Sequence, residues 1–294
     1  MNPMHTVAAP TSGGRRAALY DAFHAARART DLTARLYAVA MGDDYPGEVA
    51  SSSSCDWPLL GHMAARLRMS PGQVLVDAGC GTGGIGLWLA RALALRLEGF
   101  DLSSVAVDQA TRRRTGFLGH AASRACFRVA DLEDTGLPDG CAGGIVCVDA
   151  LGRAEDKAAA VRELGRLLEP GGRLVMTRSL RPDATPAWAE QARAAGLEVE
   201  HVDERPGEPA MWERLYRLWI THAEDLRREL GDGQAQCMLH EAHEVLPTLS
   251  GRRAVLLTLR RPATATTASG AAVRMAGPDG QHGDRRSNPG RTAQ

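Results

Sequence analysis

A glycine-rich turn lies in the stretch VDAGCGTGGIG, which begins at residue 76. Its glycines match the dinucleotide pattern G-x-G-x-x-G through Gly79, Gly81 and Gly84, and they match G-x-G-x-G when Gly83 takes the place of Gly84. Glycine lets a backbone come close to a ligand because it has no Cβ. A match to either pattern is weak evidence by itself, so the kind of ligand must be inferred from the surrounding residues.

A carboxylate stands two residues before the first glycine, at Asp77. In a dinucleotide site the strand usually runs apolar into the turn, since a pyrophosphate lies at the helix N-terminus and a nearby carboxylate would repel it. An acid at this place suits a ligand with a cationic amine. S-adenosylmethionine carries an ammonium group, a sulfonium group and no phosphate, so Asp77 favours this cofactor over NAD.

Two later stretches extend the pattern. Asp101 lies in EGFDLS, 22 residues after Gly79, where its carboxylate can accept hydrogen bonds from both ribose hydroxyls. NAD proteins place an acid there for the same reason, so Asp101 alone does not distinguish the two ligands. Asp131 and Leu132 lie in RVADLED, where the acid can bind an adenine amino group and the leucine can pack on the ring.

These residues need a framework of short strands and helices. The apolar runs predict strands at 74–77, 95–100, 127–130, 143–150, 173–178, 197–202 and 254–259, and helices at 85–94, 103–114, 155–168 and 185–196. Such an alternation favours right-handed crossovers and a mostly parallel sheet covered on both faces. The fold class is therefore α/β, a doubly wound seven-stranded sheet with a Rossmann-like arrangement.

Additional helices flank this framework. We expect an N-terminal helical lid at 15–69 and a helical insertion at about 209–247, just before the last strand of a cofactor-binding domain at 70–261. Within the lid, Asp56 is a candidate helix cap. The ends of the chain, 1–14 and 262–294, lack apolar periodicity, so we expect both to be disordered.

Five stretches occur in a fixed order between residues 70 and 180: VLVDAGCGTGG, GFDLS, VADLED, VDALGR and LEPGGRL. This ordered set resembles the class I S-adenosylmethionine-dependent methyltransferases. The resemblance implies a set of cofactor-binding residues: Tyr20, Asp77, Gly79, Cys80, Gly81, Gly83, Asp101, Leu102, Asp131, Leu132 and Asp149. After VDAL this chain has Gly152 and Arg153, where many relatives carry His or Gln, so the resemblance gives no catalytic residue in this loop.

Aromatic residues are scarce, and several fall outside the central framework. We expect an acceptor to be held between the lid and the insertion, with these substrate-binding candidates: Tyr37, Tyr45, Trp57, Trp212 and Tyr216. A pocket lined by these aromatic rings would suit a planar or apolar acceptor. An aromatic stripe at helical spacing is also typical of an ordinary core, and this alternative applies most strongly to Trp219.

Methyl transfer is an in-line displacement at a carbon that its sulfonium leaving group already activates. Alignment of the two reactants can lower the activation barrier by about 7 to 11 kcal/mol. Neither a metal nor a general base is therefore obligatory. His24 and His222 are possible bases, but each also fits an ordinary, partly exposed side chain. His240 and His243 do not form H-E-x-x-H, so we expect no metal site, and the catalytic residue stays unassigned.

The charges exclude some partners. Lys plus Arg and Asp plus Glu both number 35, so no overall positive field favours nucleic acid or a membrane surface. The chain has no long apolar run or signal-peptide pattern, and its six cysteines are scattered, which predicts a cytoplasmic protein with reduced thiols. We expect a small-molecule acceptor, such as a bacterial specialised metabolite, and the oligomeric state is not indicated.

Three alternatives stay open at this point. An NAD-dependent oxidoreductase would bind a nicotinamide cofactor, and a non-catalytic S-adenosylmethionine-binding protein would bind the cofactor without transferring its methyl group. A nucleic-acid methyltransferase is disfavoured by the neutral charge and by the lack of an Asn/Asp-Pro-Pro-aromatic motif after the fourth strand.

Overall fold

The computed structural model describes residues 12–263, which contain a seven-stranded sheet of order β3-β2-β1-β4-β5-β7-β6. The strands are β1 (Val74–Ala78), β2 (Arg96–Asp101), β3 (Ala125–Val129), β4 (Ala142–Cys147), β5 (Leu168–Leu180), β6 (Glu198–Glu204) and β7 (Arg253–Arg260). Neighbouring strands are parallel except for β7, which runs antiparallel to β5 and β6. The predicted α/β class and mostly parallel seven-stranded sheet are confirmed.

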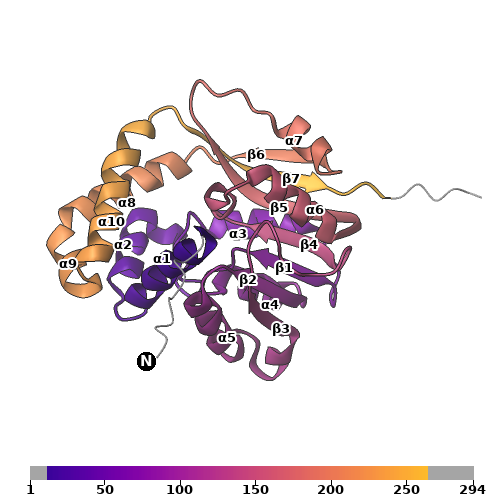
Figure 1. Ribbon diagram of the computed structural model, residues 1–294, viewed down its shortest axis with the longest axis horizontal. Coiled ribbons are helices and arrows are strands. Elements are labelled where there is room, and N and C mark those ends of the chain that lie inside the picture. Colours follow the sequence, from indigo (N-terminus) through magenta and orange to yellow (C-terminus); the bar gives the residue numbers. More distant parts are fainter. Residues whose placement is uncertain (1–11, 264–294) are drawn as a thin grey trace, which may run out of the picture. The chain divides into compact units, whose positions relative to one another are not determined.

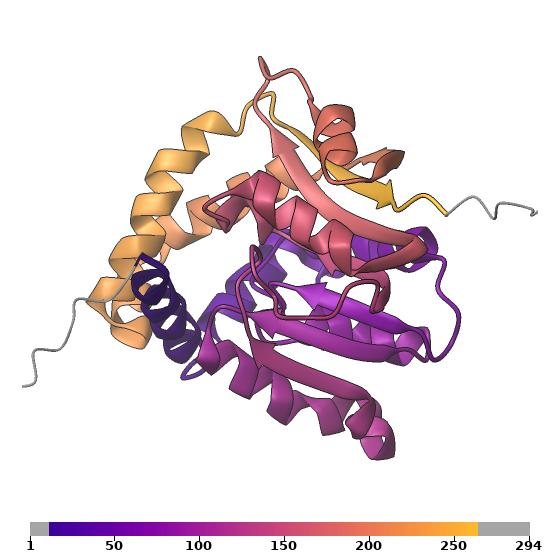
Figure 2. The ribbon, with the colours of Figure 1, turned by 45° about the vertical axis from the view of Figure 1, so that its right-hand side comes forward.

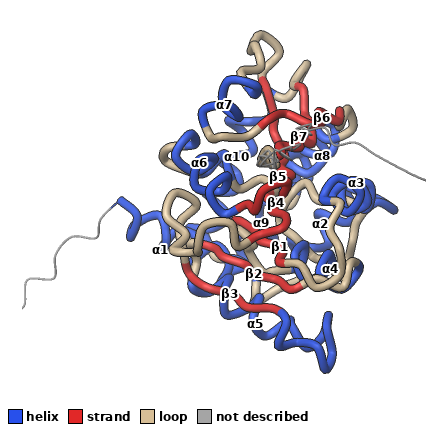
Figure 3. The backbone as a smooth tube through the Cα atoms, turned by 90° about the vertical axis from the view of Figure 1, so that its right-hand side faces the viewer, coloured by secondary structure: helices blue, strands red, loops and turns tan. Residues whose placement is uncertain are grey.

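Helices cover both faces of the sheet (Figure 3). One face carries α3 (Trp57–Leu67), α4 (Gly84–Ala92) and α5 (Ser104–Leu118), and the other carries α6 (Lys157–Leu167) and α7 (Trp188–Ala194). Successive residues of a strand point to opposite faces, so Leu75 of β1 lies in the core beneath α3 and α4 while Val76 lies in the core beneath α6. Each face therefore has its own apolar core.

A third group of helices lies beyond the carboxyl ends of the central strands (Figures 1 and 2). Its members are α1 (Ser12–Arg27), α2 (Leu32–Met41), α8 (Glu208–Thr221), α9 (Ala223–Leu230) and α10 (Asp232–Val245). Apolar side chains of α2, α8, α9 and α10 share one core, and the Arg214 Nε donates to the Ala40 carbonyl at 2.7 Å. The N-terminal helices and the insertion are thus packed together.

Local sequence explains where several helices begin. The Asp56 carboxylate accepts from the Leu59 amide at 2.7 Å, and the Ser103 hydroxyl accepts from the Ala106 amide at 3.1 Å. Both side chains satisfy amides that a helix N-terminus leaves free, and the predicted cap at Asp56 is confirmed. Short 3-10 turns complete the connections at η1 (Gly42–Asp44), η2 (Gly119–Arg124), η3 (Leu151–Arg153) and η4 (Leu246–Thr248).

Two boundaries differ from expectation. Helix α1 begins at Ser12, so residues 12–14 are helical and not disordered, while the rest of the disorder expected at the two ends falls on 1–11 and 264–294, outside the described residues. Strand β5 begins at Leu168, before the expected start at residue 173, because its pairing with β4 starts at Leu168 and resumes at Arg173 after a register shift. The insertion expected at about 209–247 begins with two helices, α8 and α9, which meet at His222 and bury apolar residues in the same core.

Candidate functional site

The glycine turn between β1 and α4 has a backbone that few other residues could adopt. Gly79, Gly81 and Gly83 have φ angles of 71°, 51° and 75°, in the left-handed region. A Cβ on Gly79 would overlap the Cβ of Ala150, and a Cβ on Gly83 would lie 2.8 Å from the Cβ of Ala110. The turn therefore packs tightly on the end of β4 and on α5.

Asp77 does not point an exposed carboxylate at the ligand side of the turn. It is 3% exposed, and its Oδ2 accepts from the Gly86 amide in the first turn of α4 at 2.9 Å. Burial raises the pKa of Asp77 to about 7, with a smaller contribution from the charge of Asp101. The direct contact with a ligand ammonium expected for Asp77 has no support in this geometry, because the side chain faces α4.

Asp101 ends β2 with its carboxylate fixed from two sides. Its Oδ2 accepts from the Gly81 amide at 2.8 Å and its Oδ1 accepts from the Ser103 amide at 2.9 Å. Each oxygen keeps a further lone pair, so the side chain is oriented yet still able to accept from a diol. Leu102 follows and is partly buried.

The next candidate pair lies at the end of β3. The Asp131 Oδ1 accepts from the Glu133 amide at 3.2 Å, and its Oδ2 lies 3.5 Å from Nη1 of Arg16 on α1. Leu132 is 9% exposed and belongs to the core on the α6 face. Asp131 therefore remains at the surface of the site, whereas Leu132 has little area left for contact with an adenine ring.

Asp149 follows β4 in a left-handed conformation, with a φ of 53°. Its Oδ1 accepts from the Thr177 hydroxyl at 2.8 Å and its Oδ2 accepts from the Ser54 amide at 2.6 Å. Such a conformation is uncommon for residues other than glycine and often marks a functional position. Asp149 joins the loop that precedes α3 to the end of the sheet.

Helix α1 lies over the carboxyl ends of the strands. The Asp21 carboxylate accepts from the Ser103 hydroxyl at 2.6 Å and from the Val105 amide at 3.2 Å, at the start of α5. Tyr20 is partly buried; burial raises its pKa, and the Asp101 charge acts in the same direction. Tyr20 and Asp101 therefore lie on the same side of the turn.

Cys80 within the turn is not a nucleophile. It is 9% exposed, and burial raises the pKa of its thiol well above the usual range. A thiol that stays protonated at neutral pH is a weak nucleophile. The role left for Cys80 is to carry the backbone of the turn, whose amides at Gly79 and Cys80 both donate to the Phe100 carbonyl at 2.9 Å.

The aromatic candidates divide into three groups. Tyr37 and Trp212 are in edge contact at 6.3 Å between centroids, and Trp212 stacks on Tyr216 at 5.5 Å. Tyr37 and Tyr216 are 3% and 4% exposed, so they belong largely to the helical core. Trp57 lies elsewhere, against Trp88 of α4 and 38% exposed. Tyr45, the remaining candidate, borders a cavity near the turn.

Glu208 is a residue that sequence reasoning missed. It is the first residue of α8 and is partly buried, with its Oε1 accepting from the Trp212 indole at 2.7 Å. Burial, and then the charge of Asp149, raise the pKa of Glu208 to about 7. The only local signal was an acid four residues before Trp212, and its proximity to Asp149 arises from the fold. A carboxyl group with such a pKa, close enough to Asp149 for its charge to act, is suited to accept a proton near neutral pH.

A second missed group connects the lid, the loop after β4 and the insertion. The Glu241 Oε1 accepts from the Tyr216 hydroxyl at 3.0 Å and lies 3.6 Å from Nη2 of Arg153. Arg16 of α1 in turn donates to the Arg153 carbonyl at 3.0 Å. These contacts close the site on the side where α10 meets α1.

Comparison with known proteins identifies the central region. A family model described as a methyltransferase domain matches residues 76–176. Phosphoethanolamine N-methyltransferase 3 of Arabidopsis thaliana is 32% identical over 141 residues, which cover 46% of this chain and 27% of that protein. The chain spans little more than a quarter of the length of the first curated relatives it matches.

Other similarities cover more of both partners. The 27-O-demethylrifamycin SV methyltransferase of Amycolatopsis mediterranei (strain S699) is 28% identical over 187 residues, 62% of this chain and 66% of that protein. The crystal structure of the [4+2]-cyclase SpnF aligns with a TM-score of 0.67 at 23% identity, covering 87% of this chain and 97% of that one, which shows a common fold. Residues 76–176 are therefore similar to a methyltransferase domain, in agreement with the resemblance to the class I S-adenosylmethionine-dependent methyltransferases.

Proposed function

We propose that this protein transfers the methyl group of S-adenosylmethionine to a small-molecule acceptor. The observation that carries the proposal is the occupied N-terminus of α4. There Asp77 accepts from the Gly86 amide, and a Cβ on Gly84 would overlap the Val49 carbonyl. A pyrophosphate needs this helix end for itself, so the arrangement favours a nucleoside without phosphate over NAD.

Asp101 is the residue best prepared to bind the nucleoside. Two backbone amides orient its carboxylate, so it can accept from the ribose diol without reorganising. Asp131 is available for the adenine amino group once Arg16, which lies 3.5 Å from it, shares or leaves that carboxylate. Asp77 stabilises the junction of the turn with α4 through its hydrogen bond from the Gly86 amide.

When bound, S-adenosylmethionine supplies a methyl group on a sulfonium leaving group. Transfer forms the bond between the acceptor atom and the methyl carbon and breaks the C–S bond, whose electron pair stays on sulfur. Glu208 is the side chain that we assign to accept the acceptor's proton, because it is partly buried, lies within reach of the charge of Asp149 and accepts a hydrogen bond from Trp212. The aromatic faces of Trp212 and Tyr45 are the surfaces left for a planar or apolar acceptor.

The acceptor class is proposed from the helices that cover the site and from the rifamycin relative. A bacterial specialised metabolite fits both. The equal numbers of basic and acidic residues, 35 of each, argue against a nucleic-acid or membrane acceptor. No helix within residues 12–263 has the length and apolar character to span a membrane. A cytoplasmic location stays a prediction.

A second candidate function is binding of the cofactor without methyl transfer. The similarity in fold to a [4+2]-cyclase supports keeping it, because one fold can serve different reactions. This candidate predicts cofactor affinity and no release of S-adenosylhomocysteine with any acceptor.

Calorimetry with S-adenosylmethionine and with NAD tests the cofactor. We expect the wild type to bind only the former, and Asp101→Ala to lose at least about 100-fold in affinity, since two oriented acceptor oxygens are removed. Asp108→Ala, at an exposed position of α5, is the matched control. Saturation with NAD alone would contradict the proposal. Methyl-labelled S-adenosylmethionine with bacterial extract, followed by mass spectrometry, then tests transfer.

A further inference from the structure

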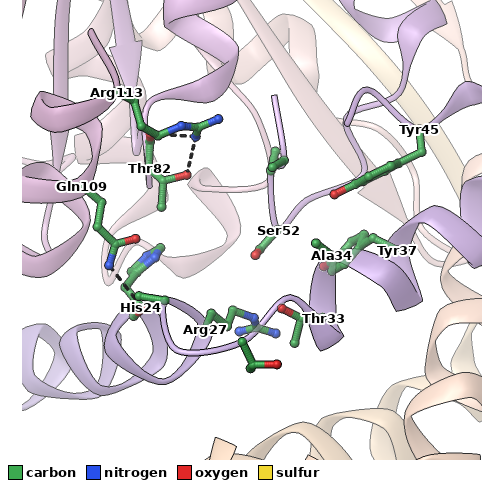
Figure 4. Close-up of a pocket in the computed structure, with 14 residues that line it drawn as sticks. His24, Arg27, Thr33, Ala34, Tyr37, Tyr45, Ser52, Thr82, Gln109 and Arg113 are labelled. Carbon is green, nitrogen blue, oxygen red and sulfur yellow. Dashed lines mark hydrogen bonds between the residues drawn. The ribbon is translucent and has the colours of Figure 1, made fainter. Parts of the chain in front are cut away.

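A cavity of about 220 Å³ lies between α1, α2, residues 45–52, the glycine turn and α5 (Figure 4). A water molecule takes up about 30 Å³ in the liquid, so the cavity has room for roughly seven waters or for one carboxylate or phosphate group. It borders the turn at Thr82 and the aromatic group at Tyr37. It therefore adjoins both the cofactor side and the acceptor side of the site.

The lining of this cavity is rich in hydrogen-bond donors. Two guanidinium groups, an imidazole, an amide and several hydroxyls contribute to it, and none of the lining residues that the structure describes is Asp or Glu. Figure 4 shows the hydroxyls of Ser52 and Tyr45 directed into the space beside Arg27. A wall of this composition is complementary to negative charge.

One of the two guanidinium groups is already engaged. Arg113 donates to the Thr82 carbonyl at 3.0 Å and to its hydroxyl at 2.9 Å, and through its other terminal nitrogen to the carbonyls of Glu48 and Val49 at 2.8 and 2.9 Å. This arginine holds the loop before α3 against the turn. Its hydrogen bonds are accounted for without a ligand.

The other guanidinium group, on Arg27, has no carboxylate within ion-pair distance among residues 12–263. Its Cζ lies 3.6 Å from the centroid of the Phe23 ring, and its Nη2 donates to the Met238 Sδ at 3.7 Å. Its Nε and Nη1 are buried and find no hydrogen-bond partner within the described residues. Glu241 acts on it only through space, because that carboxylate accepts from Tyr216 and faces Arg153.

Arg27 nevertheless remains charged at neutral pH, although burial lowers its pKa to about 10. A desolvated guanidinium without an anion is unfavourable, since neither an opposite charge nor a full set of hydrogen bonds replaces its hydration. Such a group is retained at a cost in stability. This cost is explained if an anion pairs with the Arg27 guanidinium when a ligand is bound.

We propose that this cavity receives an anionic group, a carboxylate or a phosphate, of a ligand bound at the site, with Arg27 as its counter-ion. The inference rests on the proposed function and adds a charge requirement to it. The anion can come from the amino-acid carboxylate of the cofactor or from an acidic group on the acceptor, and both sources share this chemistry. Thr33 and Ser52 supply neutral hydrogen bonds around it.

The test compares Arg27→Met, an apolar side chain of similar length, with Arg35→Met, which removes an exposed arginine from α2. Calorimetry measures three probes: S-adenosylhomocysteine, 5′-methylthioadenosine, which is the same nucleoside without the amino acid, and inorganic phosphate with and without saturating S-adenosylhomocysteine. We expect Arg27→Met to lose about 10- to 100-fold for an anionic probe and nothing for 5′-methylthioadenosine. Arg35→Met should match the wild type throughout.

The probes separate the two sources. A loss confined to S-adenosylhomocysteine, together with phosphate that competes with it, assigns the cavity to the cofactor carboxylate. A loss of phosphate binding in the presence of saturating S-adenosylhomocysteine assigns it to the acceptor. Equal binding of every probe to Arg27→Met and the wild type would overturn the inference, as would a parallel loss for 5′-methylthioadenosine.

Thermal unfolding without ligand is the second measurement. We expect Arg27→Met to unfold at the same or a higher temperature, because an uncompensated buried charge has been removed. A lower temperature accompanied by parallel losses for all probes would assign Arg27 to the fold and contradict the inference. If the wild type binds neither nucleoside, the proposed function fails; if it binds both and Arg27 has no effect, only the inference fails.

Discussion

Burial raises the pKa of both Asp77 and Glu208 to about 7, yet the two carboxyl groups lie in regions built in different ways. Asp77 is 3% exposed and bonded to a backbone amide nine residues away in the chain. Glu208 is partly buried and owes part of its shift to Asp149, on a distant segment. The first group is enclosed by a turn, whereas the second lies at the start of α8, within reach of the charge of Asp149.

The difference extends to the regions around them. On the turn side, short connections fix the carboxylates of Asp77 and Asp101 through backbone amides. On the helical side, contacts join residues far apart in sequence, such as Arg29 with Leu230 and Thr30 with Glu229. A group held rigidly by its own turn is suited to support binding, and a half-enclosed group at a junction is suited to exchange protons with a ligand.

The largest expected effect comes from Glu208→Gln. If Glu208 accepts the acceptor's proton, kcat should fall about 10²- to 10⁴-fold while affinity for S-adenosylhomocysteine stays unchanged. In the wild type kcat should rise with pH around 7, because the base must lose its proton, and the variant should lack this rise. Glu213→Gln on the same helix is the control. Unchanged kcat with an unchanged pH profile would remove the proposed role.

Asp77→Asn tests the opposite role for the enclosed carboxyl group. The folded-state pKa of about 7 exceeds the ordinary value of 3.8, so between these pH values the folded chain keeps a proton that the unfolded chain releases. Stability is therefore greatest at the acidic end of this interval and falls as pH rises through 7, by up to about 4 kcal/mol.

Asparagine keeps an oxygen for the Gly86 amide and does not ionise, so Asp77→Asn should lose much of this pH dependence. Urea unfolding between pH 5 and 8 measures it, with Asp108→Asn as the exposed control. Equal slopes of stability against pH in Asp77→Asn and the wild type would show that Asp77 titrates normally.

Two glycine substitutions give the smallest effects. They compare a closely packed glycine of the turn with a glycine of α3 that has open space beside it. Gly79→Ala should destabilise by about 1 to 3 kcal/mol, because its φ is 71° and the new Cβ would overlap that of Ala150. Gly61→Ala, inside α3 with nothing near the added Cβ, should stabilise by about 0.5 to 1 kcal/mol. Thermal unfolding checks both signs, and a neutral Gly79→Ala would mean that the turn is not closely packed.

The sequence predicted the sheet, the glycine turn and the cap at Asp56, because each depends on residues near one another in the chain. It missed the direction of Asp77. Residues two apart in a strand share a face, so Leu75 and Asp77 both point to α4, and this signal was present but unused.

The helical side could not be predicted in the same way. Glu208 acquires its properties from Asp149, and Arg27 from Phe23 and Met238, through packing that only the folded chain brings about. Trp57 illustrates the converse. Its aromatic type suggested a place beside the acceptor, but the fold puts it against Trp88 of α4. The roles of these residues toward a ligand stay predictions.

The packing of α2 against α8 also limits how this protein could be altered. The Tyr37 ring contacts the Trp212 ring, and the Arg214 side chain donates to the Ala40 carbonyl. The contact surfaces of α2 and α8 therefore depend on each other. A chimera that imports only the insertion of a relative would inherit mismatched partners. Exchange of acceptor preference should therefore require residues 12–55 and 208–249 to be transplanted as a pair, and natural variation in the two segments should be correlated.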